Sequence, residues 1–289
     1  MSDSYRPAAD TTPVYRGMDR ATLDAAYNNS AAVADSADWI AKWQRHSAVL
    51  RAMPGVQLDV AYGGRDRERL DYLPSGASRA PLFAFIHGGY WQRNAKETFA
   101  FVAQGPHARG LDVATLGYTL APTARLSEIV AEIRQALSFL DQNADRFGFS
   151  RGNIFVGGWS AGGHLATVVC DHPAVRGALA ISGIFDLEPI ALSYINEAVQ
   201  LDRGEITDLS PLYHLRSGIA PQCLTVGGDE LSELQRQSTA YAEAANRLGL
   251  PVTLRMLPRH HHFSILDELA KADGVLTDEL LNLISVGRQ

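Results

Sequence analysis

A serine, a histidine and two neighbouring carboxylates stand where this sequence could perform chemistry. Ser160 is the central residue of G-W-S-A-G at 158–162, which fits the pattern G-x-S-x-G. Small residues around a serine allow a tight turn between a strand and a helix, and that turn exposes the hydroxyl as a nucleophile. An apolar run at 154–156 precedes the turn and a helical pattern from Ala161 to Cys170 follows it. We therefore predict that Ser160 is a nucleophile on a strained strand–helix turn.

A glycine-rich loop could stabilise the negative charge that such a nucleophile creates. The strand-like run Leu82 to Ile86 is followed by H-G-G-Y-W at 87–91. Glycines directly after a strand let backbone amides approach a developing oxyanion closely, whereas an ordinary tight turn is the alternative explanation. We expect the amides of Gly89, Tyr90 and Ala161 to form the oxyanion hole.

Two later strand ends supply an acid and a histidine. The run Cys223 to Val226 is followed by Asp229 and Glu230, and the run Val252 to Met256 leads to His262. Serine, acid and histidine in this chain order form a catalytic triad, in which the acid orients the imidazole that activates the serine. We assign the acid to Glu230 because such strands often end in glycine, two further residues and then the acid. Asp229 is the alternative acid; otherwise it would cap the next helix or bond nearby loop amides.

Histidines and cysteines give little support for a metal centre. Residues 260–262 are three consecutive histidines, but adjacent side chains diverge in an extended loop, and no H-x-x-x-H or Cys/His set accompanies them. Cys170 and Cys223 lack C-x-x-C spacing and are expected to be buried apolar side chains. We predict no metal and no other cofactor.

Alternating strand-like and helical patterns predict a mostly parallel sheet with helices on both faces, and an antiparallel edge formed by the first two strands. Strands are expected at 56–62, 70–73, 82–86, 113–116, 154–156, 177–181, 223–226 and 252–256. Helices are expected at 19–27, with Asp19 as its cap, and at 36–53, 97–109, 126–147, 161–170, 232–248 and from 264 onward. Residues 185–221 should form a long insertion with one helical piece over the carboxyl edge of the sheet.

Composition and charge favour a small-molecule partner. The chain has 289 residues, 46% of them hydrophobic, and a formal net charge of −6. No block of Lys or Arg suggests nucleic acid or an acidic membrane surface, and no apolar run has the length of a signal peptide or a membrane span. We predict a cytoplasmic protein with no nucleic-acid or membrane partner, for which a homodimer is compatible with the sequence.

The sequence resembles the kynurenine formamidase (arylformamidase) branch of the α/β-hydrolases, near the hormone-sensitive-lipase-like esterases. The likeness covers residues 55–285 and is carried by H-G-G-Y-W at 87–91, G-W-S-A-G-G-H-L at 158–165, S-G-I-F-D-L-E-P-I at 182–190, R-Q-S at 236–238 and H-F at 262–263. It implies a cofactor-free Ser-Asp-His hydrolase of the α/β-hydrolase fold. Such enzymes remove formyl from an aryl amine, typically in N-formyl-kynurenine, and cleave small activated esters. Aligning these motifs sets Glu230 on the family's Asp, which is a departure from the pattern.

Taken with the resemblance, the sequence predicts an N-terminal arm and helical cap at 1–54 and an α/β-hydrolase catalytic domain at 55–289. Trp91 and Trp159 lie inside two motifs and are expected to contact the substrate, whereas Trp39 and Trp43 on the N-terminal helix either pack in the core or cap the pocket. The expected activity is hydrolysis of a small N-formyl aryl amide or short-chain aryl ester. A general short-chain carboxylesterase is the alternative. A non-catalytic ligand-binding relative is disfavoured because all three triad residue types are present.

Overall fold

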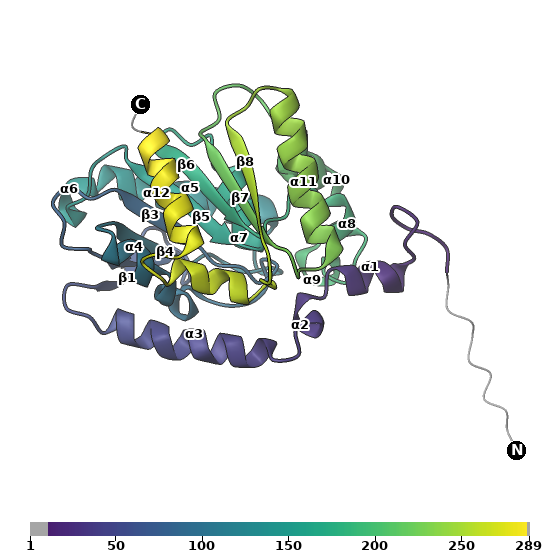
Figure 1. The fold of residues 1–289 in the computed structure, drawn as a ribbon, viewed down its shortest axis with the longest axis horizontal. Helices are drawn as coiled ribbons and strands as arrows, with labels where there is room; N and C mark the ends of the chain where they lie inside the picture. Colours follow the sequence, from purple (N-terminus) through teal and green to yellow (C-terminus); the bar gives the residue numbers. More distant parts are fainter. Residues whose placement is uncertain (1–10, 288–289) are drawn as a thin grey trace, which may run out of the picture.

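The computed structural model describes residues 11–287, which are built around an eight-stranded sheet (Figure 1). Its strands are β1 (Gln57–Ala61), β2 (Arg69–Leu73), β3 (Leu82–Ile86), β4 (Asp112–Leu116), β5 (Ile154–Trp159), β6 (Val175–Ile181), β7 (Gln222–Gly227) and β8 (Val252–Leu257). They lie in the order β1-β2-β4-β3-β5-β6-β7-β8. β1 and β2 form the antiparallel edge, and the strands from β4 to β8 are parallel. The predicted strands and the predicted topology are thus confirmed.

Helices precede the first strand, connect most of the later strands and follow the last one. The α-helices are α1 (Arg20–Ala26), α2 (Asn29–Ala32), α3 (Ser36–Arg51), α4 (Gln104–Ala108), α5 (Leu126–Gln142), α6 (Ala144–Phe147), α7 (Ala161–Val168), α8 (Glu188–Ala191), α9 (Asn196–Val199), α10 (Arg203–Leu209), α11 (Ser232–Arg247) and α12 (Val275–Val286). Asp19 caps α1 as predicted, because its side chain accepts a hydrogen bond from the Thr22 amide at 2.8 Å. Among the described residues, no helix has the length and apolar character needed to cross a membrane.

Successive side chains of the central strands point to opposite faces of the sheet and pack in separate core layers. On β3, Leu82, Ala84 and Ile86 pack in one hydrophobic cluster, while Phe83 and Phe85 pack in the other. The first cluster is covered by α5 and α7, and the second by α3 and α12 (Figure 1). A parallel sheet buried on both faces directs the residues beyond its carboxyl edge to one common site.

Three predicted helices are broken where the sequence pattern suggested continuity. Residues 97–109 form two 3₁₀ helices and the short α4, and within α4 a Cβ on Gly105 would lie 2.4 Å from the Lys271 carbonyl oxygen. The helix expected at 126–147 is interrupted at Asn143, whose side-chain amide bonds the Phe139 carbonyl at 2.8 Å.

The last helix and the insertion also differ from expectation. The chain after Ser264 forms a 3₁₀ helix and then α12, separated near Gly274, where a Cβ would lie 1.9 Å from the Glu268 carbonyl oxygen. The insertion at 185–221 contains α8, α9, α10 and a 3₁₀ turn instead of one helical piece. Close backbone packing and short polar caps divide these segments, and neither is visible in hydrophobic periodicity.

The N-terminal helix α3 shares its core with the sheet. Trp43 is fully buried and stacks on Phe101 with ring centres 5.1 Å apart. It also meets Trp159 edge-on at 5.4 Å and stacks on Phe263 at 5.9 Å. Ser47 links the same helix to the 3₁₀ helix Lys96–Thr98 by donating to the Thr98 carbonyl at 2.8 Å. Trp43 is therefore a core residue. The division at residue 54 stays a prediction, and the first ten residues of the predicted arm lie outside the described residues.

Replacing Trp43 should test how much the packing of α3 on the sheet stabilises the fold. Trp43→Ala should lower the free energy of unfolding by about 3–5 kcal/mol, because it leaves a cavity among aromatic rings. Val49→Ala, on the exposed face of the same helix, should change it by less than about 0.5 kcal/mol. Urea denaturation measures both, and equal effects of the two substitutions would contradict the packing described here.

Candidate active site

The turn between β5 and α7 exposes Ser160 in a strained conformation. Its φ is 58° and its ψ is −120°, a combination that residues with a side chain rarely adopt. Glycine is required on both sides: a Cβ on Gly158 would lie 2.3 Å from the Gly162 carbonyl oxygen, and one on Gly162 would lie 2.0 Å from that of Ile86. The Ser160 amide donates to the Ile181 carbonyl at 2.8 Å. These contacts fix the elbow against β3 and β6.

The loop after β3 brings unpaired backbone donors against this elbow. Gly89, Tyr90 and Trp91 have φ values of 116°, 50° and 58° in succession. A Cβ on the preceding Gly88 would lie 3.0 Å from Ser160 Cβ, so the loop backbone touches the elbow. Within the described part of the chain, the amides of Gly89, Tyr90 and Ala161 have no hydrogen-bond acceptor. Donors that are free and fixed in this way can bind an oxyanion without reorganising.

Glu230 and His262 form a buried hydrogen-bonded pair. The Nδ1 atom of His262 lies 2.7 Å from Glu230 Oε2, and both side chains are buried. Because an ionised carboxylate only accepts, Nδ1 carries the proton and leaves Nε2 of a neutral imidazole free to act as a base. Glu230 Oε1 accepts from Ser182 Oγ at 2.6 Å and from the Gly227 amide at 2.7 Å. The carboxylate is thus held by three donors.

Asp229, the alternative acid, points elsewhere. Its side chain is exposed, and its amide donates to the His260 carbonyl at 3.0 Å. The expected helix-capping role is wrong, because α11 begins after Leu231 without a side-chain cap. The turn that carries Glu230 into the core directs its neighbour toward solvent.

Ser182 was not identified from the sequence as a functional residue. It directly follows β6 and has a φ of 52°. A hydroxyl at the carboxyl end of the strand beside β7 was the available signal, since the acid was expected after that neighbouring strand. The motif at 182–190 contained Ser182 without indicating its contact.

The three consecutive histidines face different neighbours. His262 contacts Glu230, whereas His261 lies edge-on to Trp39 with ring centres 5.4 Å apart. Nε2 of His260 is 3.9 Å from a carboxylate oxygen of Glu268. In the described residues, no group of His, Cys, Asp and Glu side chains is arranged to hold a metal ion.

A cavity of about 290 Å³ contains Ser160 and His262. It is lined by Asn29, Ser30, Ser36, Ala37, Ile40, Gly89, Tyr90, Arg93, Asn94, Trp159, Ser160, His262 and Phe263. The N-terminal helices thus form part of its wall. Within residues 11–287, Ser160 Oγ and His262 Nε2 share no hydrogen bond, a contact that often tightens only when substrate binds.

The two motif tryptophans have different surroundings. Trp159 lines the cavity, and its Nε1 donates to the His262 carbonyl at 2.8 Å. Trp91, also expected to contact substrate, is fully buried and is absent from the cavity wall; this expectation is corrected. The left-handed backbone at Tyr90 and Trp91 turns the indole back into the core, where it lies edge-on to His164 with ring centres 5.0 Å apart.

Two other buried histidines support the loop and the elbow helix. Nδ1 of His87 donates to the Gly88 carbonyl at 2.9 Å, and Nε2 of His164 donates to the Leu209 carbonyl at 2.8 Å. Burial lowers the pKa of each imidazole to about 4. Both rings are therefore neutral at pH 7 and act as structural supports.

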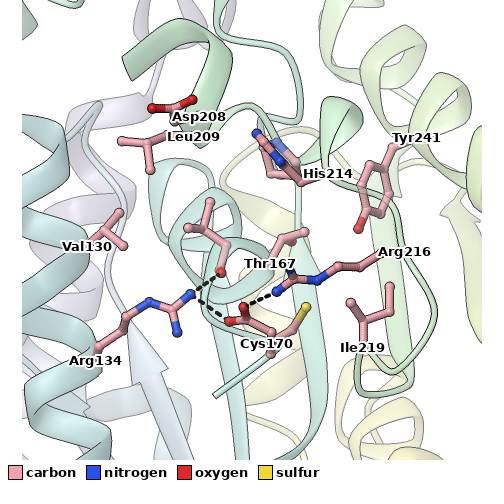
Figure 2. Close-up of a pocket in the computed structure, with 13 residues that line it drawn as sticks. Val130, Arg134, Thr167, Cys170, Asp208, Leu209, His214, Arg216, Ile219 and Tyr241 are labelled. Carbon is pink, nitrogen blue, oxygen red and sulfur yellow. Dashed lines mark hydrogen bonds and ion pairs between the residues drawn. The ribbon is translucent and has the colours of Figure 1, made fainter. Parts of the chain in front are cut away.

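A second cavity of about 270 Å³ lies beside α5, α7, α10 and α11 (Figure 2). Two arginines of its wall are paired with an acid of the same wall: Arg134 and Arg216 each contact a carboxylate oxygen of Asp171 at 2.6 Å. His214 Nε2 donates to the Thr207 carbonyl at 2.7 Å. Neither Ser160 nor His262 lines this space. The cavity with Ser160 is therefore the candidate active site.

Comparisons with known proteins agree with this geometry. Residues 70–176 match the BD-FAE family model. Kynurenine formamidase from Danio rerio is 32% identical over 249 residues, which span 81% of this chain and 84% of the relative. The chain belongs to the kynurenine formamidase family. The carboxylic ester hydrolase LipN of Mycobacterium tuberculosis is 27% identical over 287 residues, which span 86% of this chain and 76% of LipN.

Solved structures support the same fold. A putative thioesterase from Silicibacter sp. TM1040 has a TM-score of 0.80 and 28% identity, covering 89% of this chain and 97% of its own. The thermostable carboxylesterase EstE1 has a TM-score of 0.71 and 18% identity, covering 88% and 97%, and supports the fold alone. The predicted α/β-hydrolase fold and the resemblance to kynurenine formamidases are confirmed. This family member is a hydrolase of amide or ester bonds.

The two neighbouring acids can be distinguished by isosteric substitution. In Glu230→Gln, two donors already face the Oε1 position, so the amide oxygen should turn there and the amide NH₂ should face His262 Nδ1. That arrangement favours the wrong imidazole tautomer, and kcat should fall by up to about 10⁴-fold. Asp229→Asn is the matched control, with near-normal kcat and a change in stability below about 0.5 kcal/mol. A large loss of kcat confined to Asp229→Asn would reverse the assignment.

The buried histidines should make stability sensitive to acid. Their folded-state pKa of about 4 is below the ordinary 6.5, so the unfolded chain takes up protons first as pH falls. Stability is fully present above pH 6.5 and declines toward pH 4, by about 2 kcal/mol per histidine at pH 5. His164→Gln should remove its share of this decline, whereas His46→Gln, on the exposed face of α3, should not. Unfolding titrations at pH 7 and 5 measure it; identical slopes for wild type and His164→Gln would refute the assignment.

Proposed function

We propose that this chain is a serine hydrolase that removes formyl or another small acyl group from an aryl amine, and that it also cleaves short-chain aryl esters. One observation carries the proposal: Ser160 shares a cavity with His262, whose Nδ1 is bonded to Glu230. Membership of the kynurenine formamidase family supports the amide substrate.

In the proposed mechanism, Ser160 Oγ attacks the acyl carbonyl and His262 Nε2 accepts the hydroxyl proton. His262 then gives this proton to the departing amine. A water molecule next attacks the acyl group on Ser160, with His262 again accepting the proton. His262 returns this proton to Ser160 Oγ as the free acid leaves. Glu230 holds the imidazole tautomer throughout. The amides of Gly89, Tyr90 and Ala161 would bind the oxyanion, each stabilising the transition state by about 3 kcal/mol.

The wall of the cavity supports a small substrate with a flat ring. Its volume of about 290 Å³ is at the lower end for ligand sites. Trp159 and Phe263 offer aromatic surface, and Ile40 on α3 offers an aliphatic one. The relatives' name makes N-formyl-kynurenine the first substrate to test.

A general short-chain carboxylesterase is the second candidate, favoured by the similarity to LipN. The ratio of N-formyl-kynurenine to p-nitrophenyl butyrate turnover separates the two activities. The bonded Glu230–His262 pair argues against a non-catalytic relative of the fold. The predicted cytoplasmic location, the compatible homodimer and the predicted absence of nucleic-acid partners stay predictions.

Removing the nucleophile tests the proposal directly. Ser160→Ala should abolish hydrolysis of N-formyl-kynurenine and p-nitrophenyl acetate, together with labelling by a fluorophosphonate, while circular dichroism stays unchanged. Ser285→Ala, at an exposed position on α12, is the matched control and should keep both properties. If the Ser160→Ala enzyme kept more than a few per cent of the activity, Ser160 would not be the nucleophile.

A further inference from the structure

Arg93 gives the wall of the candidate active site a permanent positive charge. Of the thirteen residues that line the cavity with Ser160, none is Asp or Glu, and Arg93 is the one whose side chain is always charged. In the described part of the chain, its guanidinium takes part in no hydrogen bond or ion pair. A protein with a formal net charge of −6 thus has an unpaired cation in the cavity that holds its nucleophile.

The backbone of Arg93 is fixed against the loop that carries two of the proposed oxyanion donors. Its amide donates to the Gly89 carbonyl at 3.0 Å, and a Cβ on Gly89 would lie 2.5 Å from the Arg93 carbonyl oxygen. The next residue, Asn94, donates from Nδ2 to the Gly88 carbonyl at 3.1 Å. These contacts hold the base of the arginine side chain at a set place relative to the Gly89 and Tyr90 amides.

The guanidinium lies on the side of the cavity that the N-terminal helices form. Burial raises the pKa of Tyr194 and raises that of Tyr90 well above its ordinary value, and the positive charge of Arg93 opposes both shifts. The guanidinium is therefore within electrostatic range of both hydroxyls. The Tyr90 hydroxyl contacts Asn29 of α2, another residue of the wall, at 3.1 Å. Because Arg93 is exposed, a ligand can reach its guanidinium without displacing a protein group.

An unpaired guanidinium in a ligand cavity favours an anion, and its planar fork matches the two oxygens of a carboxylate. Formyl, the acyl group expected for this family, has a single carbon and cannot carry such a charge. The anion must therefore belong to the aryl amine that leaves. Trp159 and Phe263 offer surface for the ring of that amine, and a side chain on the ring extends the substrate along the wall.

We propose that Arg93 pairs with a carboxylate on the leaving aryl amine, so that anionic formanilides are the preferred substrate class of this enzyme. This rests on the proposed function and leaves its nucleophile, base and oxyanion donors unchanged. The pair forms when substrate binds and persists in the transition state, because the carboxylate takes no part in the bond that breaks. Arg93 therefore lowers KM for anionic substrates and changes kcat little.

The test compares two formanilides of the same shape. One is N-formyl-kynurenine without its amino group, which carries a single carboxylate, and the other is the primary amide of that acid, which is neutral. The wild-type enzyme should have the higher kcat/KM for the acid. Arg93→Gln should lower the acid-to-amide ratio of kcat/KM by about five- to tenfold, chiefly through KM, as expected for one partly exposed bidentate pair. Arg93→Lys keeps the charge without the fork and should give an intermediate ratio.

Arg45→Gln is the matched control, because Arg45 is exposed on α3, has no ion pair within residues 11–287 and does not line the cavity. It should leave the ratio unchanged. Raising the ionic strength to about 0.5 M should lower the ratio of the wild type but not that of Arg93→Gln, since salt screens a charge pair. A purely structural role of Arg93 would not produce this salt dependence.

A wild-type ratio at or below one, or a ratio that Arg93→Gln or salt leaves unchanged, overturns the inference while the proposed function stands. An equal loss on both substrates in Arg93→Gln also overturns it, because it would mean that Arg93 only supports the oxyanion loop. The same follows if Arg45→Gln matches Arg93→Gln, since the charge of the whole protein would then set the preference. A wild-type enzyme with no Ser160-dependent release of aryl amine from either substrate refutes the proposed function and this inference with it.

Discussion

One carboxylate joins three neighbouring strand ends in this structure. Glu230 follows β7 and accepts three hydrogen bonds. Their donors are the Ser182 hydroxyl at the end of β6, the Gly227 amide at the end of β7 and the His262 ring in the loop after β8. A buried charge is tolerated only when its lone pairs are satisfied, and three donors meet that requirement. The same contacts fix the direction of the imidazole. Stability of this edge of the sheet and readiness of the base therefore depend on the same hydrogen bonds.

The N-terminal helices have a comparable role on the other side of the site. The Tyr90 hydroxyl donates to the Tyr27 carbonyl, and the Tyr27 hydroxyl donates to Glu233 of α11 at 3.1 Å. Gln237 donates to the Tyr27 hydroxyl at 2.7 Å. The loop that carries the oxyanion amides is thus anchored to residues before the first strand. The motifs that carry the family resemblance all lie after residue 86, although these N-terminal helices form part of the cavity wall.

Motifs at strand ends allowed the parallel core and the pairing of Glu230 with His262 to be predicted. Their chain order and the rule that ligands bind at the carboxyl edge were sufficient, because both depend on short stretches of sequence. Trp91 could not be placed, since its direction depends on left-handed φ values at Tyr90 and Trp91 that no periodicity reports. Ser182 gains its role from a partner 48 residues away. Hydrophobic patterns also could not locate the helix breaks made by close backbone contacts.

The position of Trp43 has a consequence for the order in which the chain can mature. Its ring packs on Phe101, Trp159 and Phe263, and its indole N–H bonds Asp267, a residue 224 positions later. Contacts between such distant segments form slowly, because the loop between them must first close. During synthesis, α3 emerges early but finds its last aromatic partners only when the segment after β8 has left the ribosome. The catalytic cavity is therefore completed at the end of translation, and a nascent chain that stops before His262 lacks both its base and the Phe263 ring that packs on Trp43 of α3.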